Sequence, residues 1–249
     1  MVPNLFTVAN MALGFFAILA AFEQRWIAAP TAIFIAHIMD ILDGRIARWL
    51  GLTSDFGMEF DSFADLISFG LAPAIMIYLL ALQDYGRVGI ALAFFFVLCG
   101  AIRLTRFNLK AAIPSDAPSM VFSGLPIPVA GGSLAVLVLL FGLYQENHQG
   151  RTMTILYRQI PLLQAGIPVI VAGLAWLMVS KIQYATFKKT HLFKPQSLRS
   201  FMVMLFILFM IYAYPQNTIF ILYFTYIIWG ILNGAWRTYR LRTHKDTPS

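Results

Sequence analysis

The sequence contains few charged residues and almost no cysteine. Only 12% of its 249 residues are charged, whereas 59% are hydrophobic and the mean hydropathy is +0.75. So few polar side chains cannot cover the surface of a water-soluble globule, which excludes that class and indicates a membrane protein. The single cysteine, Cys99, cannot form an internal disulfide, and its apolar neighbours predict a small buried side chain.

Other familiar patterns are absent from the sequence. The basic residues form no stripe interleaved with aromatic residues, and no nucleic-acid-binding module is recognisable, so no nucleic acid is expected as a partner. The chain has no long linker, low-complexity tract or clear internal repeat, so the inverted repeats of many secondary transporters are not expected either. We therefore expect residues 1–249 to form a single integral membrane domain.

The long apolar segments predict an all-α polytopic membrane protein. A helix needs about 20 mostly apolar residues to cross the hydrocarbon core of a bilayer. No lysine or arginine precedes the first apolar segment, so we interpret it as a membrane helix and not as a signal peptide. Eight predicted spans lie at about residues 5–22, 27–48, 61–82, 88–106, 125–144, 160–180, 200–214 and 217–236.

The basic residues favour one orientation of these helices. With the N-terminus in the cytoplasm, 14 of the 18 lysines and arginines lie in cytoplasmic segments, including the basic tail 237–249, and four lie outside. This distribution obeys the positive-inside rule. We therefore expect both termini to be cytoplasmic in an inner (cytoplasmic) membrane, whose anionic lipid headgroups the basic residues would also attract.

Acidic residues are rare, and most of them are concentrated in one stretch. A carboxylate at the centre of a membrane helix costs about 2.5–3.5 kcal/mol on insertion scales, so aspartates in membrane spans need compensation. We expect bound metal to provide it, at the cytoplasmic ends of the second and third spans. Six of the eleven acidic residues lie within residues 40–65: Asp40, Asp43, Asp55, Glu59, Asp61 and Asp65.

The spacing of the aspartates predicts a site between two helices. At 100° per residue, two sets of residues each share one helical stripe, and a short turn through residues 51–54 lets the stripes face each other. Carboxylate oxygens with no cysteine nearby suit Mg²⁺ or Mn²⁺ better than zinc or copper. The small residues leave room for a bulky ligand, and the arginine can bind phosphate. The sets are Asp40, Asp43, Gly44, Ala47 and Arg48, and Gly57, Asp61 and Asp65.

Written as one pattern, these positions resemble a family signature. The pattern Asp40-x2-Asp43-Gly44-x2-Ala47-Arg48-x8-Gly57-x3-Asp61-x3-Asp65 matches that of the CDP-alcohol phosphatidyltransferases at every fixed position. Segments 3–10, 61–73, 99–108 and 124–128 further resemble the branch of CDP-diacylglycerol–serine O-phosphatidyltransferases (phosphatidylserine synthases), and 177–188 does so more loosely. The resemblance implies a homodimer whose six-helix core spans about residues 1–180, with the helices at about 200–236 as an addition.

The resemblance also implies a reaction and a set of site residues. The phosphatidyl group of CDP-diacylglycerol would be transferred to the hydroxyl of L-serine, giving phosphatidylserine and CMP. Asp65 would also deprotonate the incoming hydroxyl, a role that requires one of its oxygens to be at least partly free of metal. Two divalent ions would be bound by Asp40, Asp43, Asp61 and Asp65, and CDP by Asp43, Gly44, Ala47, Arg48 and Gly57.

Several residues have two interpretations. Asn4, Thr7 and Asn10 either form hydrogen bonds within the first helix or reach the nucleotide phosphates. Arg103 and Arg106 either end the fourth span on its positive side or bind the serine carboxylate or a lipid phosphate. Pro126 and Pro128 either simply kink the fifth span or open a cavity for the alcohol, and His37 is interpreted as a core residue and not as a metal ligand.

Two alternative functions stay open. The same chemistry could use another acceptor, such as glycerol 3-phosphate, inositol phosphate, glycerol or choline. A protein of a different class, a divalent-cation or proton-coupled transporter, could use the intramembrane carboxylates as its ion pathway.

Overall fold

The computed structural model describes most of the chain. It covers residues 2–51, 54–112, 121–145, 165–180, 182–185 and 212–243, with a few residues between 202 and 210. The predicted span 200–214 therefore lies partly outside the described residues. The side chains of Asn4, Ala47 and Arg48 lie outside them as well.

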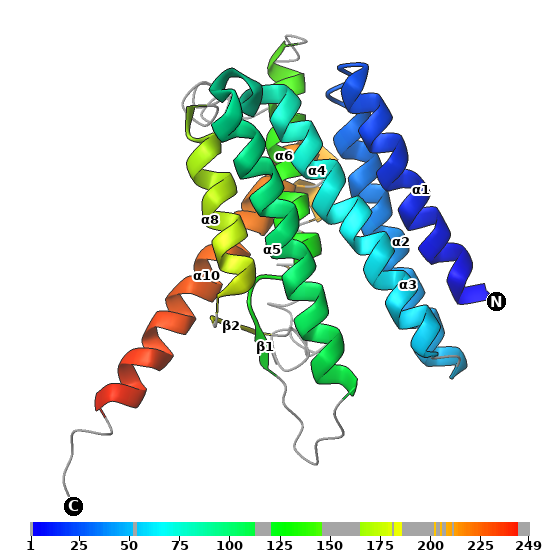
Figure 1. Ribbon diagram of the computed structural model, residues 1–249, viewed down its shortest axis with the longest axis vertical. Coiled ribbons are helices and arrows are strands. Elements are labelled where there is room, and N and C mark those ends of the chain that lie inside the picture. The colour runs from blue at the N-terminus through cyan, green and yellow to red at the C-terminus, as the bar shows by residue number, and fades with distance from the viewer. Residues whose placement is uncertain are drawn as a thin grey trace, which may run out of the picture.

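The described residues form a bundle of long helices (Figure 1). The N-terminal half contains α1 (Val2–Phe22), α2 (Ala28–Leu50), α3 (Asp55–Asp65), α4 (Ala72–Ile77) and α5 (Arg87–Ala112). The π-helical segment η1 (Leu66–Leu71) joins α3 to α4, and a second one, η2 (Tyr78–Leu82), continues this rod to the 3₁₀ turn η3 (Gln83–Tyr85). The C-terminal half contains α6 (Ile127–Gln145), α8 (Ile167–Val179) and α10 (Pro215–Thr243).

Strand structure in the described residues is limited to one short ribbon. β1 (Val121–Ser123) pairs antiparallel with β2 (Gln183–Ala185), with Phe122 opposite Tyr184. The chain then turns through Gly124, whose φ is +88°, and Leu125 N donates to Leu177 O, so the ribbon fixes the start of α6 against the end of α8.

The helices confirm the prediction of an all-α polytopic membrane protein. Five described helical stretches are long and apolar enough to span a bilayer: Leu5–Phe22, Asp55–Tyr85, Arg87–Leu109, Ile127–Gln145 and Pro215–Gly234. The shorter α8 falls within the predicted span 160–180. α2 forms as predicted but is too charged to qualify by composition, because its second half carries two aspartates and two arginines.

The prolines of the fifth span do not kink a helix. α6 begins at Ile127, so Pro126 precedes it and Pro128 lies in its first turn. Proline is tolerated there because the first backbone N–H groups of a helix have no partner within the helix. The kink expected from the sequence is therefore not present.

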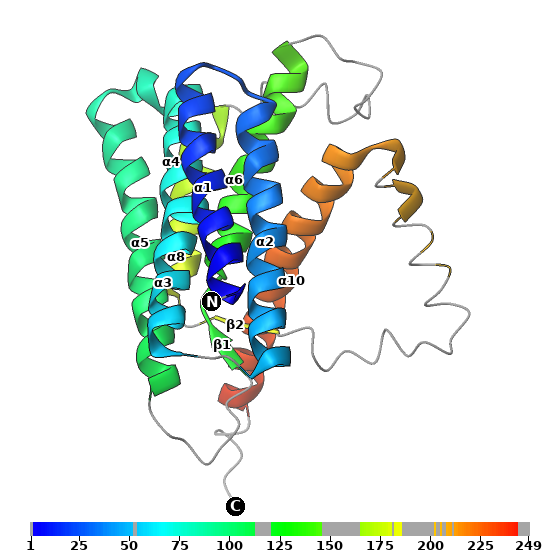
Figure 2. The same cartoon turned by 90° about the vertical axis from the view of Figure 1, so that its right-hand side faces the viewer.

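Small residues let the helices approach closely. α1 and α2 run antiparallel side by side (Figure 2), with Ala17, Ala20 and Ala21 of α1 buried and Ala32 and Ala36 of α2 buried likewise. Without a hydrophobic driving force in lipid, close packing of this kind is a major source of helix association. The α1–α2 pair is thereby held close, which matters for the site below.

The aspartate-bearing segments meet at one end of the bundle, which we call the site end. α1 begins there, α2 ends there and α3 begins there (Figures 1 and 2). Gly51, with φ +65°, ends α2 in the left-handed conformation that favours glycine. Ser54 caps α3 by accepting a hydrogen bond from Gly57 N at 3.0 Å. The turn predicted between the two helices is therefore defined by its end residues.

We expect Gly131→Ala to destabilise the protein. A Cβ on Gly131 would lie 2.8 Å from Phe69 Cα, against the backbone of η1, which cannot move aside as a flexible side chain can. Overpacking of this kind costs about 1–3 kcal/mol. The measurement is the melting temperature of the purified protein in detergent.

Gly173→Ala in α8 is the matched control. Nothing lies within 4 Å of the Cβ position at Gly173, so its melting temperature should stay the same or rise slightly. Equal melting temperatures for wild type and Gly131→Ala would contradict the close contact between α6 and η1.

Candidate active site

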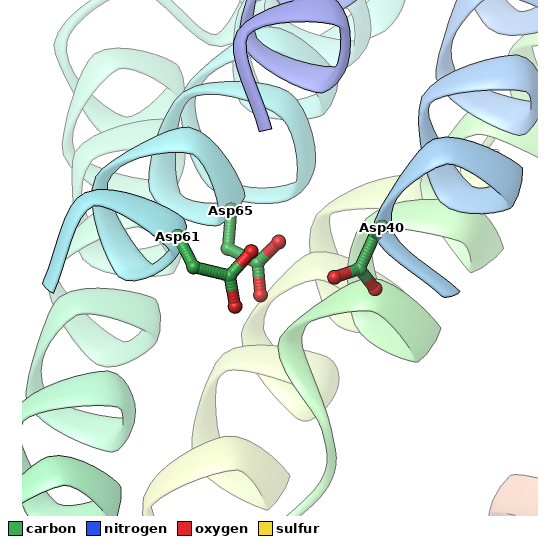
Figure 3. A group of neighbouring side chains, drawn as sticks. All are labelled: Asp40, Asp61 and Asp65. Atoms are coloured by element: carbon green, nitrogen blue, oxygen red, sulfur yellow. The ribbon is translucent and has the colours of Figure 1, made fainter. Parts of the chain in front are cut away.

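Three aspartates from two helices converge at the site end. Asp40 projects from α2, and Asp61 and Asp65 project from α3, one turn apart (Figure 3). One carboxylate oxygen from each lies within 4.8 Å of the other two. Asp65 is buried, and Asp40 and Asp61 are half-buried. Three carboxylates this close repel one another strongly unless cations or protons lie between them.

Helix α1 provides hydrogen-bond donors to this acidic end. Thr7 Oγ1 donates to Asp43 Oδ2, and Asn10 Nδ2 donates to Asp65 Oδ1 at 3.3 Å. Asn10 is itself fixed, because its backbone carbonyl accepts a hydrogen bond from Ser68 Oγ at 2.8 Å. Thr7 and Asn10 therefore orient two of the four aspartates.

Asp43 lies beside the group of three aspartates and interacts electrostatically with Asp40 and Asp61. The sequence predicted two facing pairs of carboxylates, but the close group consists of Asp40, Asp61 and Asp65. Asp43 is buried and its Oδ2 is directed to Thr7 of α1. Residues three apart share one helix face but differ by about 60° around the axis, so Asp40 can point to α3 while Asp43 points to α1.

Three buried oxygens at the site have no hydrogen-bond partner. They are Asn10 Oδ1, Asp43 Oδ1 and Asp61 Oδ1. An unpartnered buried oxygen is costly, and these three are acceptors that a cation could satisfy. The oxygen-only donor set fits a hard divalent cation, so the cluster can hold a metal ion.

His37 does not belong to this donor set. Its Nδ1 lies 3.3 Å from the hydroxyl of Tyr223, and its ring meets Phe69 edge-on at a centroid distance of 5.4 Å. These contacts agree with its interpretation as a core residue.

The two arginines of α5 have different surroundings. Arg103 is half-buried and interacts electrostatically with Asp65, and its guanidinium carbon lies 5.9 Å from the centre of the Phe107 ring. Arg106 is exposed, and its Nη1 donates to Val179 O, the last carbonyl of α8, at 3.0 Å. Arg106 thus caps a helix C-terminus, whereas Arg103 faces the aspartates.

The glycines of the predicted CDP pocket lie at the edge of the acidic group. Gly44 is exposed on α2, one residue after Asp43. Gly57 lies in the first turn of α3, where a Cβ would meet only Ser54 Oγ, at 3.1 Å. Both positions leave backbone accessible beside the carboxylates, as a pocket for a large ligand requires.

Other contacts at the site could not be foreseen. Ser62 of α3 and Asn108 of α5 are hydrogen-bonded, with Asn108 Nδ2 3.0 Å from Ser62 Oγ. Tyr223 reaches His37 from a helix 186 residues away in sequence. A polar residue within an apolar run was the only available signal for these side chains, and it does not identify a partner.

Comparison with known proteins gives a family. The model of the CDP-alcohol phosphatidyltransferase family matches residues 1–178. A CDP-diacylglycerol–serine O-phosphatidyltransferase of Helicobacter pylori is 37% identical over 244 residues, covering 98% of this chain and 95% of that protein. A protein with the same name from Bacillus subtilis is 35% identical over 188 residues, covering 76% of this chain and 92% of the relative.

An archaeal relative extends the comparison. The archaetidylserine synthase of Methanothermobacter thermautotrophicus is 38% identical over 146 residues, which cover 58% of this chain and 60% of that protein. The matched region of the family model includes every aspartate of the site and the helices α1 to α5 that position them. This chain is a membrane-embedded transferase that belongs to the CDP-alcohol phosphatidyltransferase family.

Proposed function

We propose that this protein transfers the phosphatidyl group of CDP-diacylglycerol to the hydroxyl of L-serine, releasing CMP. The group of Asp40, Asp61 and Asp65 within 4.8 Å carries the proposal, because it offers the hard oxygen ligands that a pyrophosphate-cleaving metal site needs. Serine as the acceptor is supported by the relatives, since both bacterial proteins are CDP-diacylglycerol–serine O-phosphatidyltransferases by name and the archaeal one is an archaetidylserine synthase.

The proposed metal ligands are the four aspartates, with Mg²⁺ or Mn²⁺ as the ions. Bound there, two divalent cations would neutralise charge on the pyrophosphate and on the leaving CMP. Asp40 of α2 faces Asp61 and Asp65 of α3, and Asp43 offers the oxygen Oδ1, which has no hydrogen-bond partner. The proposed CDP pocket extends from there along Gly44, Ala47 and Arg48 of α2 and Gly57 of α3, with Asn4 and Thr7 of α1 beside it.

In the transfer step one bond forms and one breaks. The serine hydroxyl oxygen attacks the β-phosphorus, and the bond from that phosphorus to the oxygen bridging to CMP breaks. CMP leaves with the electron pair, and the hydroxyl proton passes to Asp65. Asp65 suits this role because only one of its oxygens is engaged by Asn10, which leaves the other for a proton. No covalent enzyme intermediate is needed.

We further propose that the site end faces the cytoplasm. Basic residues support this orientation. The helix α2 ends at the site end and carries Arg45 and Arg48 in its last turns, and α5 carries Arg103 and Arg106 in its C-terminal half. The last turns of α10, up to residue 243, add Arg237, Arg240 and Arg242, as the positive-inside rule requires. Soluble serine and CMP would then exchange with the cytosol. The whole chain acts as one membrane domain in this proposal, with the homodimer that the family resemblance implies.

The first test is CMP release by the purified protein. CDP-diacylglycerol is offered with Mn²⁺ or Mg²⁺ and, separately, serine, glycerol 3-phosphate, inositol phosphate, glycerol or choline. We expect release only with serine, and loss of release with EDTA. Release with a different alcohol would replace the acceptor and keep the chemistry, whereas no release with any alcohol would favour the transporter alternative.

Asp61→Asn should abolish activity without unfolding the protein. Positioning residues around metal ligands typically contribute 10–100-fold, so removing a ligand charge should lower turnover by at least about 100-fold. Turnover and melting temperature are measured together. Glu59→Gln, an exposed acid on the same helix, is the matched control and should retain activity. An active Asp61→Asn would remove the metal role from this residue.

Thr7→Val should weaken metal use, because it removes the hydroxyl that donates to Asp43 while keeping the side-chain shape. We expect the Mn²⁺ concentration for half-maximal CMP release to rise by about 10-fold or more. Thr31→Val, whose hydroxyl donates only to Ile27 O at the opposite end of α2, is the control. Identical Mn²⁺ titrations for both variants would show that Thr7 does not orient Asp43.

A further inference from the structure

The C-terminal helix α10 lies outside the family match but approaches the site. The family model ends at residue 178, whereas α10 begins at Pro215. α10 crosses α6 obliquely and descends toward the site end of the bundle (Figures 1 and 2). It runs in the same direction along the bundle as α2, which carries Asp40.

Tyr223 fixes the register of α10 against the core. Its hydroxyl lies 3.3 Å from Nδ1 of His37, which is one turn before Asp40 on α2. Its ring lies against α6 where Gly132 has no side chain, since a Cβ there would be 2.5 Å from the Cζ of Tyr223. Further along, Gly234 meets Ile182 in the same way, with 2.8 Å from a Cβ to Cγ2. Contacts with three separate segments therefore hold α10 in place.

Tyr226 follows Tyr223 by nearly one turn and lies on the same side of α10. It is half-buried and packs against the core. Asp40 lies three residues beyond His37 on α2, as Tyr226 lies three residues beyond Tyr223 on α10, and both helices descend in the same direction. From the His37–Tyr223 contact, both helices therefore lead toward the site end.

Arg103 joins Tyr226 to the site. Its guanidinium lies close enough to both the Tyr226 side chain and Asp65 for their charged forms to interact with it. Among the described residues, no carboxylate lies within ion-pair distance of Arg103. The Arg103 guanidinium is half-buried and faces the proposed base, Asp65, but forms no ion pair with it. Such a group suits an anionic group on the acceptor, because a guanidinium can bind a carboxylate through two parallel hydrogen bonds.

We propose that α10 forms one wall of the acceptor subsite and that Tyr226 is a positioning residue, which holds Arg103 in the orientation that binds the carboxylate of an amino-acid acceptor. This inference rests on the proposed function and adds a residue from outside the family core. A wall of this kind adds acceptor affinity and leaves the transfer chemistry to the aspartates.

The test is Tyr226→Phe, which removes only the hydroxyl. We expect the KM for serine to rise about 10-fold, with kcat and the KM for CDP-diacylglycerol within about two-fold of wild type. The rise in melting temperature that saturating serine gives the wild type should shrink in parallel. Tyr212→Phe, an exposed tyrosine of the segment before α10, is the matched control and should match the wild type in every parameter.

A second variant separates positioning from packing. In an Arg103→Lys background, where the fork that binds a carboxylate is lost, Tyr226→Phe should raise the KM for serine no further, because coupled residues are not additive. An unchanged KM for serine in Tyr226→Phe, or equal changes in both substrates' KM with a lower melting temperature, would overturn the positioning role.

The two proposals fail in different ways. A wild type that uses serine while Tyr226→Phe keeps its KM would overturn the inference about α10 alone. If the wild type uses another alcohol, serine is not the acceptor. If the KM for that alcohol is also unchanged in Tyr226→Phe, the proposal that α10 forms a wall of the acceptor subsite is overturned as well. A wild type that uses no alcohol would overturn both.

Discussion

The repulsion among carboxylates inside a membrane protein is the constraint on which this structure depends. Asp40, Asp61 and Asp65 place oxygens within 4.8 Å of one another at the end of two membrane helices, where water cannot screen them as it would at a soluble surface. Such a group is stable only when cations or protons offset the repulsion. The unpartnered oxygens of Asn10, Asp43 and Asp61 at the same place are acceptors that a bound cation could satisfy.

The remainder of the bundle serves to hold these groups still. Alanines bring α1 against α2, and this closeness lets the short side chains of Thr7 and Asn10 reach aspartates on α2 and α3. Longer side chains could reach across a wider gap, but with more rotamers to restrict and less exact placement. The close packing of small residues and the orientation of the aspartates are therefore one feature of the structure.

Much of this architecture could be predicted from the sequence, and the rest could not for identifiable reasons. Long apolar runs predict the helices. The spacing of Asp40, Asp61 and Asp65 predicts that they converge, because helix geometry places each set of aspartates on one stripe and the short turn between the two helices lets the stripes face each other. The pairing of Asp43 with Thr7 depends on how α1 packs, which helical period does not encode. The approach of Tyr223 to His37 joins helices far apart in sequence. The kink predicted at Pro126 and Pro128 was wrong because α6 begins only at Ile127, after the β1–β2 ribbon, and no local sequence pattern predicts that ribbon.

The π-helical segment η1 has a consequence for how this protein can change. It begins directly after Asp65 and widens the helix by an extra residue per turn over Leu66–Leu71. The rod from Asp55 to Leu82 therefore consists of two parts in different rotational phase. The part before η1 presents aspartates to the site, and the part after it presents Met76 and Ile77 to the core. A single uniform helix would tie these two faces to one angle. With the phase break, substitutions in the core half can accumulate across related proteins without turning the carboxylates away from their ligand.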